Sequence, residues 1–203
     1  MEDTQAMQVL EGLLFVAGEP ISLDRLGHIL KEVDPARLLR LLTALTDSYD
    51  RSDCGLHIAF IAGGYQIVTR PEIAPWVREL EKTKKGARLS KPGLETLAVV
   101  AYKQPVTRAE IEMIRGVDSA GVLRTLMDRK LVRMIGKREA PGHPMMYGTT
   151  RSFLEYLGIA DLSALPPLKA FEETAPQAIG PMPNGPYSEG TTLLADSEAL
   201  IET

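Results

Sequence analysis

The feature that most constrains this chain is a diverged internal repeat. The segment LEGLLFVAGEPIS, residues 10–22, resembles LETLAVVAYKQPVT, residues 94–107. Both begin Leu-Glu-x-Leu, continue through a short apolar run, and turn at a proline that precedes a β-branched and then a hydroxyl residue. An offset of about 84 residues in a chain of 203 leaves room for two small domains of one type.

The apolar spacing predicts the same helices in both copies. The first helix of each copy has apolar residues at i, i+3, i+4 and i+7, which gives one buried stripe. These are Leu10, Leu13, Leu14 and Ala17 in the first copy, and Leu94, Leu97, Ala98 and Ala101 in the second. Ser22 and Thr107 then occupy the N-cap positions of the second helices, and Thr107 with Glu110 matches a capping box. Asp34-Pro35 and Asp118 predict the starts of third helices.

A hairpin is predicted after each third helix. LHIAF and YQIVT surround Gly63-Gly64, while LVRMIG and MMYGTT flank the longer loop KREAPGHP. The predicted fold class is therefore mainly α with small β-hairpin wings (α+β), arranged as two tandem winged helix-turn-helix domains. We assign residues 1–82 and 92–165 to these domains and residues 83–91 to a basic linker. The acidic segment 166–203 is rich in Pro and Gly, a composition that predicts disorder.

Composition favours a reducing compartment and argues against secretion. Cys54 is the single cysteine, so an internal disulfide is excluded. The beginning MEDTQAMQVL lacks the basic start and apolar core of a signal peptide, and no apolar run approaches the roughly 20 residues of a membrane-spanning helix. We expect a cytoplasmic protein.

No catalytic constellation is visible. The sequence lacks a Gly-x-x-x-x-Gly-Lys phosphate loop. His28, His57 and His143 are scattered over different predicted elements, and Cys54 has no evident neighbouring base. We expect no catalytic residues, no metal site and no cofactor, and hence no enzyme.

Charge leaves two interpretations of the helix-turn-helix pattern open. Residues 1–82 carry eight basic and thirteen acidic side chains, whereas residues 83–157 carry fourteen basic and seven acidic ones. Arg124 and Arg129 on the second copy's third helix favour a contact with DNA phosphate or guanine. So do the linker residues Lys84, Lys85, Arg88 and Lys91, whose binding would be non-specific and salt-sensitive.

Against a sequence-specific reader, the second copy's third helix lacks a cluster of Asn, Gln and Arg, and the first copy's domain is acidic. A winged helix also serves as a scaffold for protein assembly. A DNA-binding transcription regulator and a protein-binding scaffold both remain compatible with these residues.

Longer motifs resemble the bacterial segregation and condensation protein B family. GVDSAGVLRTLMDRKLV is similar to the start of the family's third helix. PGHPMMYGTTRSFLEYLGIADLSALPPL is similar to its return strand and closing helix. EGLLFVAGEPIS and TLAVVAYKQPVTRAEIE match its opening and mid-chain patterns, so the resemblance covers about residues 5–168. One departure is His143, where family members often have arginine.

The resemblance implies a non-enzymatic subunit of the condensin-like complex. Such a subunit forms a homodimer, chiefly through its N-terminal winged helix, and binds the kleisin called segregation and condensation protein A (ScpA). The kleisin bridges the ATPase heads of the structural-maintenance-of-chromosomes (SMC) protein. The implied role is chromosome condensation and partition during cell division, at the nucleoid, with weak non-specific DNA contact as a further option.

From the residues and this resemblance together we predict three surfaces. Arg124, Arg129, Tyr147 and Arg151 are the candidate kleisin-binding residues, although Tyr147 and Gly148 could instead only fix the return strand. Lys84, Lys85, Arg88 and Lys91 are candidate linker contacts. Leu14, Phe15, Ile58 and Phe60 are candidates for the dimer interface, with ordinary core packing as the alternative.

Overall fold

The computed structural model describes residues 1–82 and 89–167. The predicted tail beyond residue 167 and most of the predicted linker lie outside the described residues, including Lys84, Lys85 and Arg88. Lys91 is described, and it does not belong to a linker, because it is the first residue of a helix. The described fold is mainly helical with small antiparallel sheets.

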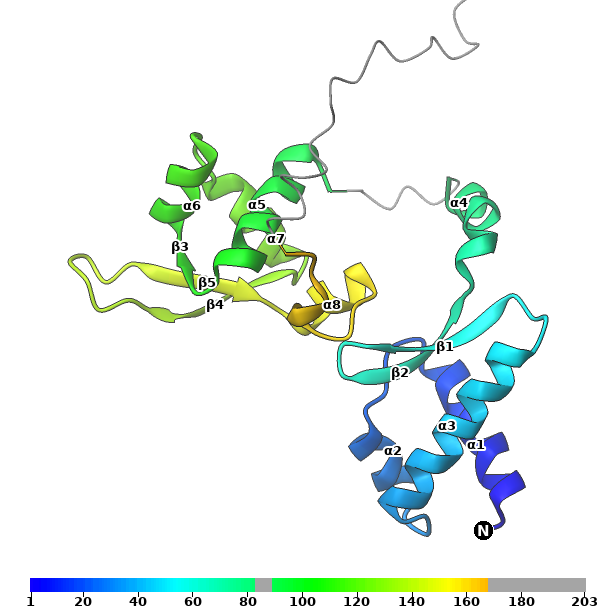
Figure 1. Ribbon diagram of the computed structural model, residues 1–203. Coiled ribbons are helices and arrows are strands. Elements are labelled where there is room, and N and C mark those ends of the chain that lie inside the picture. The colour runs from blue at the N-terminus through cyan, green and yellow to red at the C-terminus, as the bar shows by residue number, and fades with distance from the viewer. Residues whose placement is uncertain (83–88, 168–203) are drawn as a thin grey trace, which may run out of the picture. The chain divides into compact units, whose positions relative to one another are not determined.

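The first half contains three helices and a hairpin, followed by a further short helix (Figure 1). The helices are α1 (Asp3–Ala17), α2 (Leu23–Ile29) and α3 (Pro35–Arg51); the strands are β1 (Leu56–Ile61) and β2 (Gly64–Thr69); η1 (Pro71–Ile73) and α4 (Ala74–Lys82) follow. Helix α3 packs against both α1 and α2. Ile61 pairs with Gly64, so the hairpin turns at Ala62-Gly63, one residue earlier than predicted. Both turn residues have positive φ, as a tight hairpin turn requires.

The second half repeats this order and adds a strand (Figure 1). Its helices are α5 (Lys91–Lys103), α6 (Arg108–Arg115), α7 (Ala120–Asp128) and α8 (Arg151–Leu157), with η2 (Leu162–Ala164) after them. Its strands are β3 (Val106–Thr107), β4 (Val132–Lys137) and β5 (Met145–Thr149), which form an antiparallel sheet in the order β3-β5-β4. The sequence did not predict β3, because two residues are too few for a periodic signal.

Most predicted helix starts are confirmed by their capping contacts. Ser22 accepts a hydrogen bond from the backbone N–H of Arg25, and Asp34 accepts one from that of Arg37. Thr107 and Glu110 form the predicted capping box at α6. At α7 the prediction was off by one residue, because Ser119 is the N-cap while the Asp118 carboxylate accepts from the Ala120 N–H at 2.8 Å.

Each half has its own hydrophobic core. Leu10 and Leu14 of α1 are fully buried in the first core, as the predicted stripe requires. The predicted stripe of α5 is wrong at Leu94 and Ala98, which are exposed. The buried face of α5 runs through Gly93, Thr96, Leu97, Val100 and Ala101. Thr96 can lie there because its hydroxyl donates to the Pro92 carbonyl and accepts from Arg115.

Candidate partner-binding surfaces

The side chains of His28 and Cys54 make local contacts. The Nδ1 atom of His28 lies 2.7 Å from the carbonyl oxygen of Asp24. The Cys54 thiol accepts from the Ser52 hydroxyl and donates to the Leu56 carbonyl, and the Ser52 contact is the main reason that the thiol pKa is lowered. Among the residues that the structure describes, no three His, Cys, Asp or Glu side chains are grouped to hold a metal ion.

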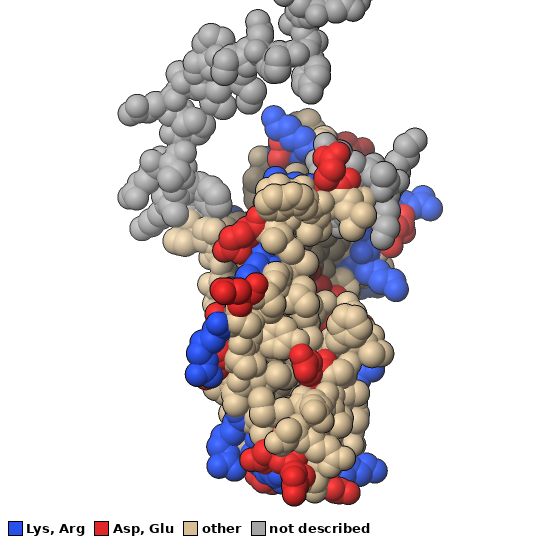
Figure 2. Space-filling view, turned by 90° about the vertical axis from the view of Figure 1, so that its right-hand side faces the viewer, with Lys and Arg blue, Asp and Glu red and all other residues tan. Residues whose placement is uncertain are grey.

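An uncharged surface runs along α1. Phe15 is 72% exposed and Val16 is 81% exposed, and Val9 lies on the same side of the helix. Gly12 lies between them, and a Cβ atom added there would meet nothing within 4 Å. We call Val9, Gly12, Phe15 and Val16 the α1 face. Figure 2 views the molecule from the side on which α1 lies in Figure 1, and uncharged side chains form a band there with charged ones mostly at its margins.

The four predicted dimer residues divide into two pairs. The side chains of Leu14 and Ile58 are buried in the first core. The prediction that these two residues lie on the surface was therefore wrong, and the alternative of core packing holds for them. Phe15 and Phe60 are exposed, and the ring of Phe60 packs edge-on against that of Tyr65 with centroids 5.1 Å apart. Sequence spacing placed Leu14 and Phe15 on one helix, but only the tertiary packing shows that Leu14 is buried and Phe15 is exposed.

A second exposed apolar surface lies on α4. Trp76 and Leu80 are one helical turn apart and are each 69% exposed. Val77, beside them, is half-buried. We call Trp76, Val77 and Leu80 the α4 stripe. This apolar side of α4 lies outside the first core.

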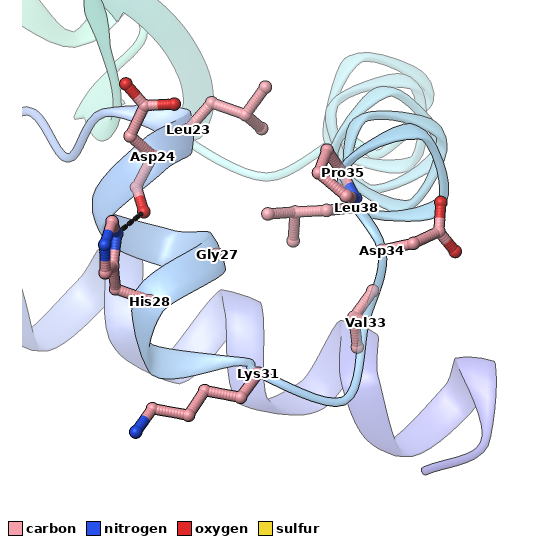
Figure 3. A pocket seen from close by; sticks show the side chains of 9 residues that line it. All are labelled: Leu23, Asp24, Gly27, His28, Lys31, Val33, Asp34, Pro35 and Leu38. Carbon is pink, nitrogen blue, oxygen red and sulfur yellow. Dashed lines mark hydrogen bonds between the residues drawn. The ribbon is translucent and has the colours of Figure 1, made fainter.

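A groove of about 450 Å³ lies between α2 and the start of α3 (Figure 3). Leu23, Pro35 and Leu38 point toward its centre, and Gly27 borders it with backbone alone. A Cβ atom at Gly27 would come 3.8 Å from a methyl group of Leu38, so the glycine keeps the groove wide. Asp24 lies at one end and Lys31 at the other. We call this the α2–α3 groove.

The predicted arginine pair on α7 does not form one patch. Arg124 is exposed on the helix, whereas Arg129 is its C-cap residue. Five helical positions correspond to about 140° of rotation about the axis, so the two side chains leave on different sides. Arg129 lines a smaller pocket with Leu89, Gly93 and Gly121. Reasoning from sequence missed this because both arginines are outside the apolar positions.

Several basic side chains of the second half are held in ion pairs. Arg151 pairs with Glu155 at 3.2 Å, and Arg115 pairs with Glu95 at 2.7 Å. Arg108 contacts both Glu112 and Asp118. The number of basic residues in this half therefore overstates how many of them a partner could contact without displacing a carboxylate of the same half.

The hairpin of the second half is fastened to α6. Arg138, at the start of the hairpin's loop, donates to Glu110 at 2.5 Å and also to the carbonyl of Pro105. Glu110 further accepts from the backbone and hydroxyl of Thr107. The Arg138 hydrogen bond is the largest cause that lowers the pKa of Glu110 to about 2.

Tyr147 and Gly148 lie on the return strand β5. Tyr147 is half-buried, packs against the second core, and pairs with Val106 and Met134. A Cβ atom at Gly148 would lie 2.9 Å from the Gln104 side-chain oxygen, which accepts from Thr149. These contacts favour the structural interpretation for Gly148, whereas a partner contact by Tyr147 stays a prediction.

The described surfaces are therefore those of a helical protein whose exposed apolar residues are suited to binding another protein. The family model for the segregation and condensation complex subunit ScpB matches residues 8–168. Segregation and condensation protein B of Moorella thermoacetica is 49% identical over 174 residues, 84% of this chain and 88% of the relative. That of Syntrophotalea carbinolica is 47% identical over 173 residues, 85% of this chain and 87% of the relative. The chain belongs to the ScpB family.

Two solved structures are also similar. ScpB from Mycobacterium tuberculosis is 35% identical, covering 78% of this chain and 98% of that chain with a TM-score of 0.39. A dimer of the ScpB N-terminal domain complexed with an ScpA peptide is 27% identical, covering 38% of this chain and 95% of that chain with a TM-score of 0.36. In the part of the chain that the structure describes, no helix is long and apolar enough to cross a membrane.

Proposed function

We propose that this protein is a non-enzymatic scaffold subunit of an SMC–kleisin complex. As a homodimer it binds the kleisin ScpA and, through the kleisin, joins the SMC ATPase heads. It thereby supports chromosome condensation and partition at the nucleoid. Membership of the ScpB family carries this proposal, and the exposed apolar surfaces of the first half support it.

Each half is proposed to be a winged helix, with β1–β2 and β4–β5 as the wings. The order of three helices and a hairpin, present in both halves, supports this assignment. A winged helix that reads DNA places its third helix in the major groove. Here α3 lies in an acidic half, and α7 offers a single exposed arginine between buried leucines, which favours a protein partner over a base-reading role.

The α2–α3 groove is proposed as a seat for an apolar segment of ScpA. Leu23, Pro35 and Leu38 offer an apolar lining, and the charged residues Asp24, Lys31 and Asp34 border it. A bound segment would therefore place apolar side chains in the groove and polar ones at its rim. Arg124 on α7 is proposed as a second contact with the same partner.

Light scattering on a size-exclusion column tests the proposal, with the full chain alone and with ScpA from the same organism. Two copies alone, and two copies with one ScpA in a single peak, are expected. Arg124→Glu should weaken ScpA binding without lowering Tm, whereas Arg40→Glu, on the exposed side of α3, should leave binding unchanged. A monomer that does not bind ScpA would overturn the proposal and favour the DNA-binding regulator.

A further inference from the structure

The first half leaves two separate apolar surfaces exposed in the single chain, the α1 face and the α4 stripe. Neither contains a charged residue. Nine residues of helix α4 are described. A helix of that length is marginal in water unless its apolar side packs against another surface. The exposed stripe therefore requires an explanation outside its own helix.

Hydrogen bonds and packing hold the segment just before α4 in place, so they determine where this helix leaves the hairpin. The guanidinium of Arg70, just before η1, donates to the carbonyls of Tyr49 at 2.7 Å, Cys54 at 2.9 Å and Ser52 at 3.3 Å. Ile73 packs beside Gly55, where an added Cβ would approach its side chain to 3.4 Å. These contacts fix the point at which α4 leaves the hairpin, while Trp76 and Leu80 stay exposed.

We infer that the α4 stripe packs on the α1 face of a second copy of this chain, and that the second copy does the same in return. Such an exchange is isologous, because each copy supplies one stripe and one face, and it closes after two copies. The residues that define the two surfaces carry no charge, so their own burial does not incur the penalty of desolvating a charge. The inference rests on the proposed homodimer and assigns its interface.

The two aromatic residues Phe15 and Trp76 give the two surfaces most of their area. Complete burial of an aromatic side chain removes roughly 150–250 Å² from water, and Phe15 and Trp76 still expose 72% and 69% of theirs. Together with the aliphatic residues Val9, Val16, Val77 and Leu80, they supply a large part of the roughly 800 Å² per partner of a standard interface. Gly12, without a side chain, allows a helix to approach α1 closely.

Trp76 is the only tryptophan in the chain, so its fluorescence reports directly on the stripe. We would measure emission and light scattering of the full chain over a dilution series. In the dimer the emission maximum should lie at shorter wavelength, and it should shift to longer wavelength as the dimer dissociates. Val16→Lys on the α1 face should raise the dimer Kd at least tenfold and produce the same red shift.

Two further variants and one control complete the experiment. Gly12→Leu, which adds bulk but no charge, and Trp76→Ala should each raise the dimer Kd. Met113→Lys changes an equally exposed side chain of the second half, 82% exposed, and should alter neither Kd nor emission. Circular dichroism would establish that each variant is folded.

The outcomes separate the two proposals. A wild-type chain that is monomeric at every concentration would contradict the proposed homodimer itself. A wild-type dimer whose Kd is unchanged in Val16→Lys, Gly12→Leu and Trp76→Ala would contradict only the exchange of α4. Loss of dimerisation in Val16→Lys with unchanged Trp76 emission would also overturn the exchange, because the stripe would then not contact the α1 face.

Discussion

The two halves of this chain share one order of helices and hairpin but carry opposite net charge. In the basic half, Arg108, Arg115, Arg138 and Arg151 are held by carboxylates of the same half. In the acidic half, the α1 face and the α4 stripe expose uncharged apolar side chains. A count of basic residues is therefore a poor guide to partners here, because carboxylates of the same half already engage several of them.

Both halves join their hairpins to the helices through backbone and side-chain contacts, but the side-chain contacts differ in charge. In the first half, Tyr65 and Ile21 exchange two backbone hydrogen bonds, and the Gln66 side chain donates to the carbonyl of the α1 C-cap residue. In the second half, β3 pairs with β5, and the ion pair of Arg138 with Glu110 joins the hairpin loop to α6. The second hairpin should therefore respond to changes of charge at this ion pair.

The largest effect is expected from equivalent core positions. Leu26 of α2 and Ile111 of α6 are both fully buried, each in its own core. Leu26→Ala and Ile111→Ala should each lower the free energy of unfolding by about 2–5 kcal/mol, measured by urea denaturation. Ile29→Ala and Ile114→Ala change exposed residues of the same helices and serve as controls. If the control variants lost as much free energy of unfolding as Leu26→Ala and Ile111→Ala, the two positions would not be equivalent core positions.

Replacing one glycine in each hairpin by alanine should distinguish a hairpin that lies against backbone atoms from one that lies against a side chain. A Cβ at Gly64 would lie 2.8 Å from the backbone carbon of Ile21, which cannot move aside, whereas at Gly148 the nearest atom is the side-chain oxygen of Gln104. Overpacking typically costs about 1–3 kcal/mol. Gly64→Ala should therefore lower the free energy of unfolding by an amount near the upper end of that range. Gly148→Ala should lower it by a smaller amount.

The measurement is the midpoint of urea unfolding for both variants. Gly121→Ala is the control, because a Cβ there meets nothing within 4 Å and alanine favours helix. Equal costs for Gly64→Ala and Gly148→Ala would show that the two hairpins are held equally rigidly.

The α2–α3 groove gives a test of which half holds ScpA. Gly27→Leu should fill the groove and weaken ScpA binding about tenfold, or about 1.4 kcal/mol, by isothermal titration calorimetry. Gly27→Ala adds only a methyl group at van der Waals distance from Leu38, so it should retain binding and raise Tm. If Gly27→Leu bound ScpA as tightly as the wild type, the seat would have to be sought in the second half.

The smallest effect concerns pH and the two second-helix caps. The pKa of Glu110 is lowered from 4.5 to about 2, so the folded state favours its ionised form. Its contribution to stability is present above about pH 4.5 and is lost as the pH falls toward 2. The difference in free energy of unfolding between the wild type and Glu110→Gln should therefore become smaller as the pH falls from about 4.5 to 2.

Ser22 caps α2 with a hydroxyl and no carboxylate, so it supplies the matched control. Ser22→Ala should cost about 0.5–2 kcal/mol at every pH. Thermal melting of both variants between pH 2 and 7 would measure the difference. A pH-independent cost for Glu110→Gln would show that its ion pair with Arg138 contributes nothing.

Local signals predicted much of the fold. Ser22, Asp34-Pro35 and the Thr107–Glu110 box placed three helix starts correctly, because capping depends on residues within one turn. The face of α5 was predicted wrongly because Thr96 reads as polar, yet its hydroxyl is satisfied by Pro92 and Arg115. The contact with Arg115 comes from a different helix, so no local pattern can reveal it.

The sequence by itself determined the repeated order of elements, the opposite charges of the halves and the family, since these depend on spacing and composition along the chain. Tertiary structure alone decided which apolar residues are core and which are surface. Leu14 and Phe15 are adjacent and both apolar, yet one is 1% and the other 72% exposed. The physical reason is that burial depends on what packs opposite a side chain, and for Leu14 that is supplied by helices and strands distant in sequence.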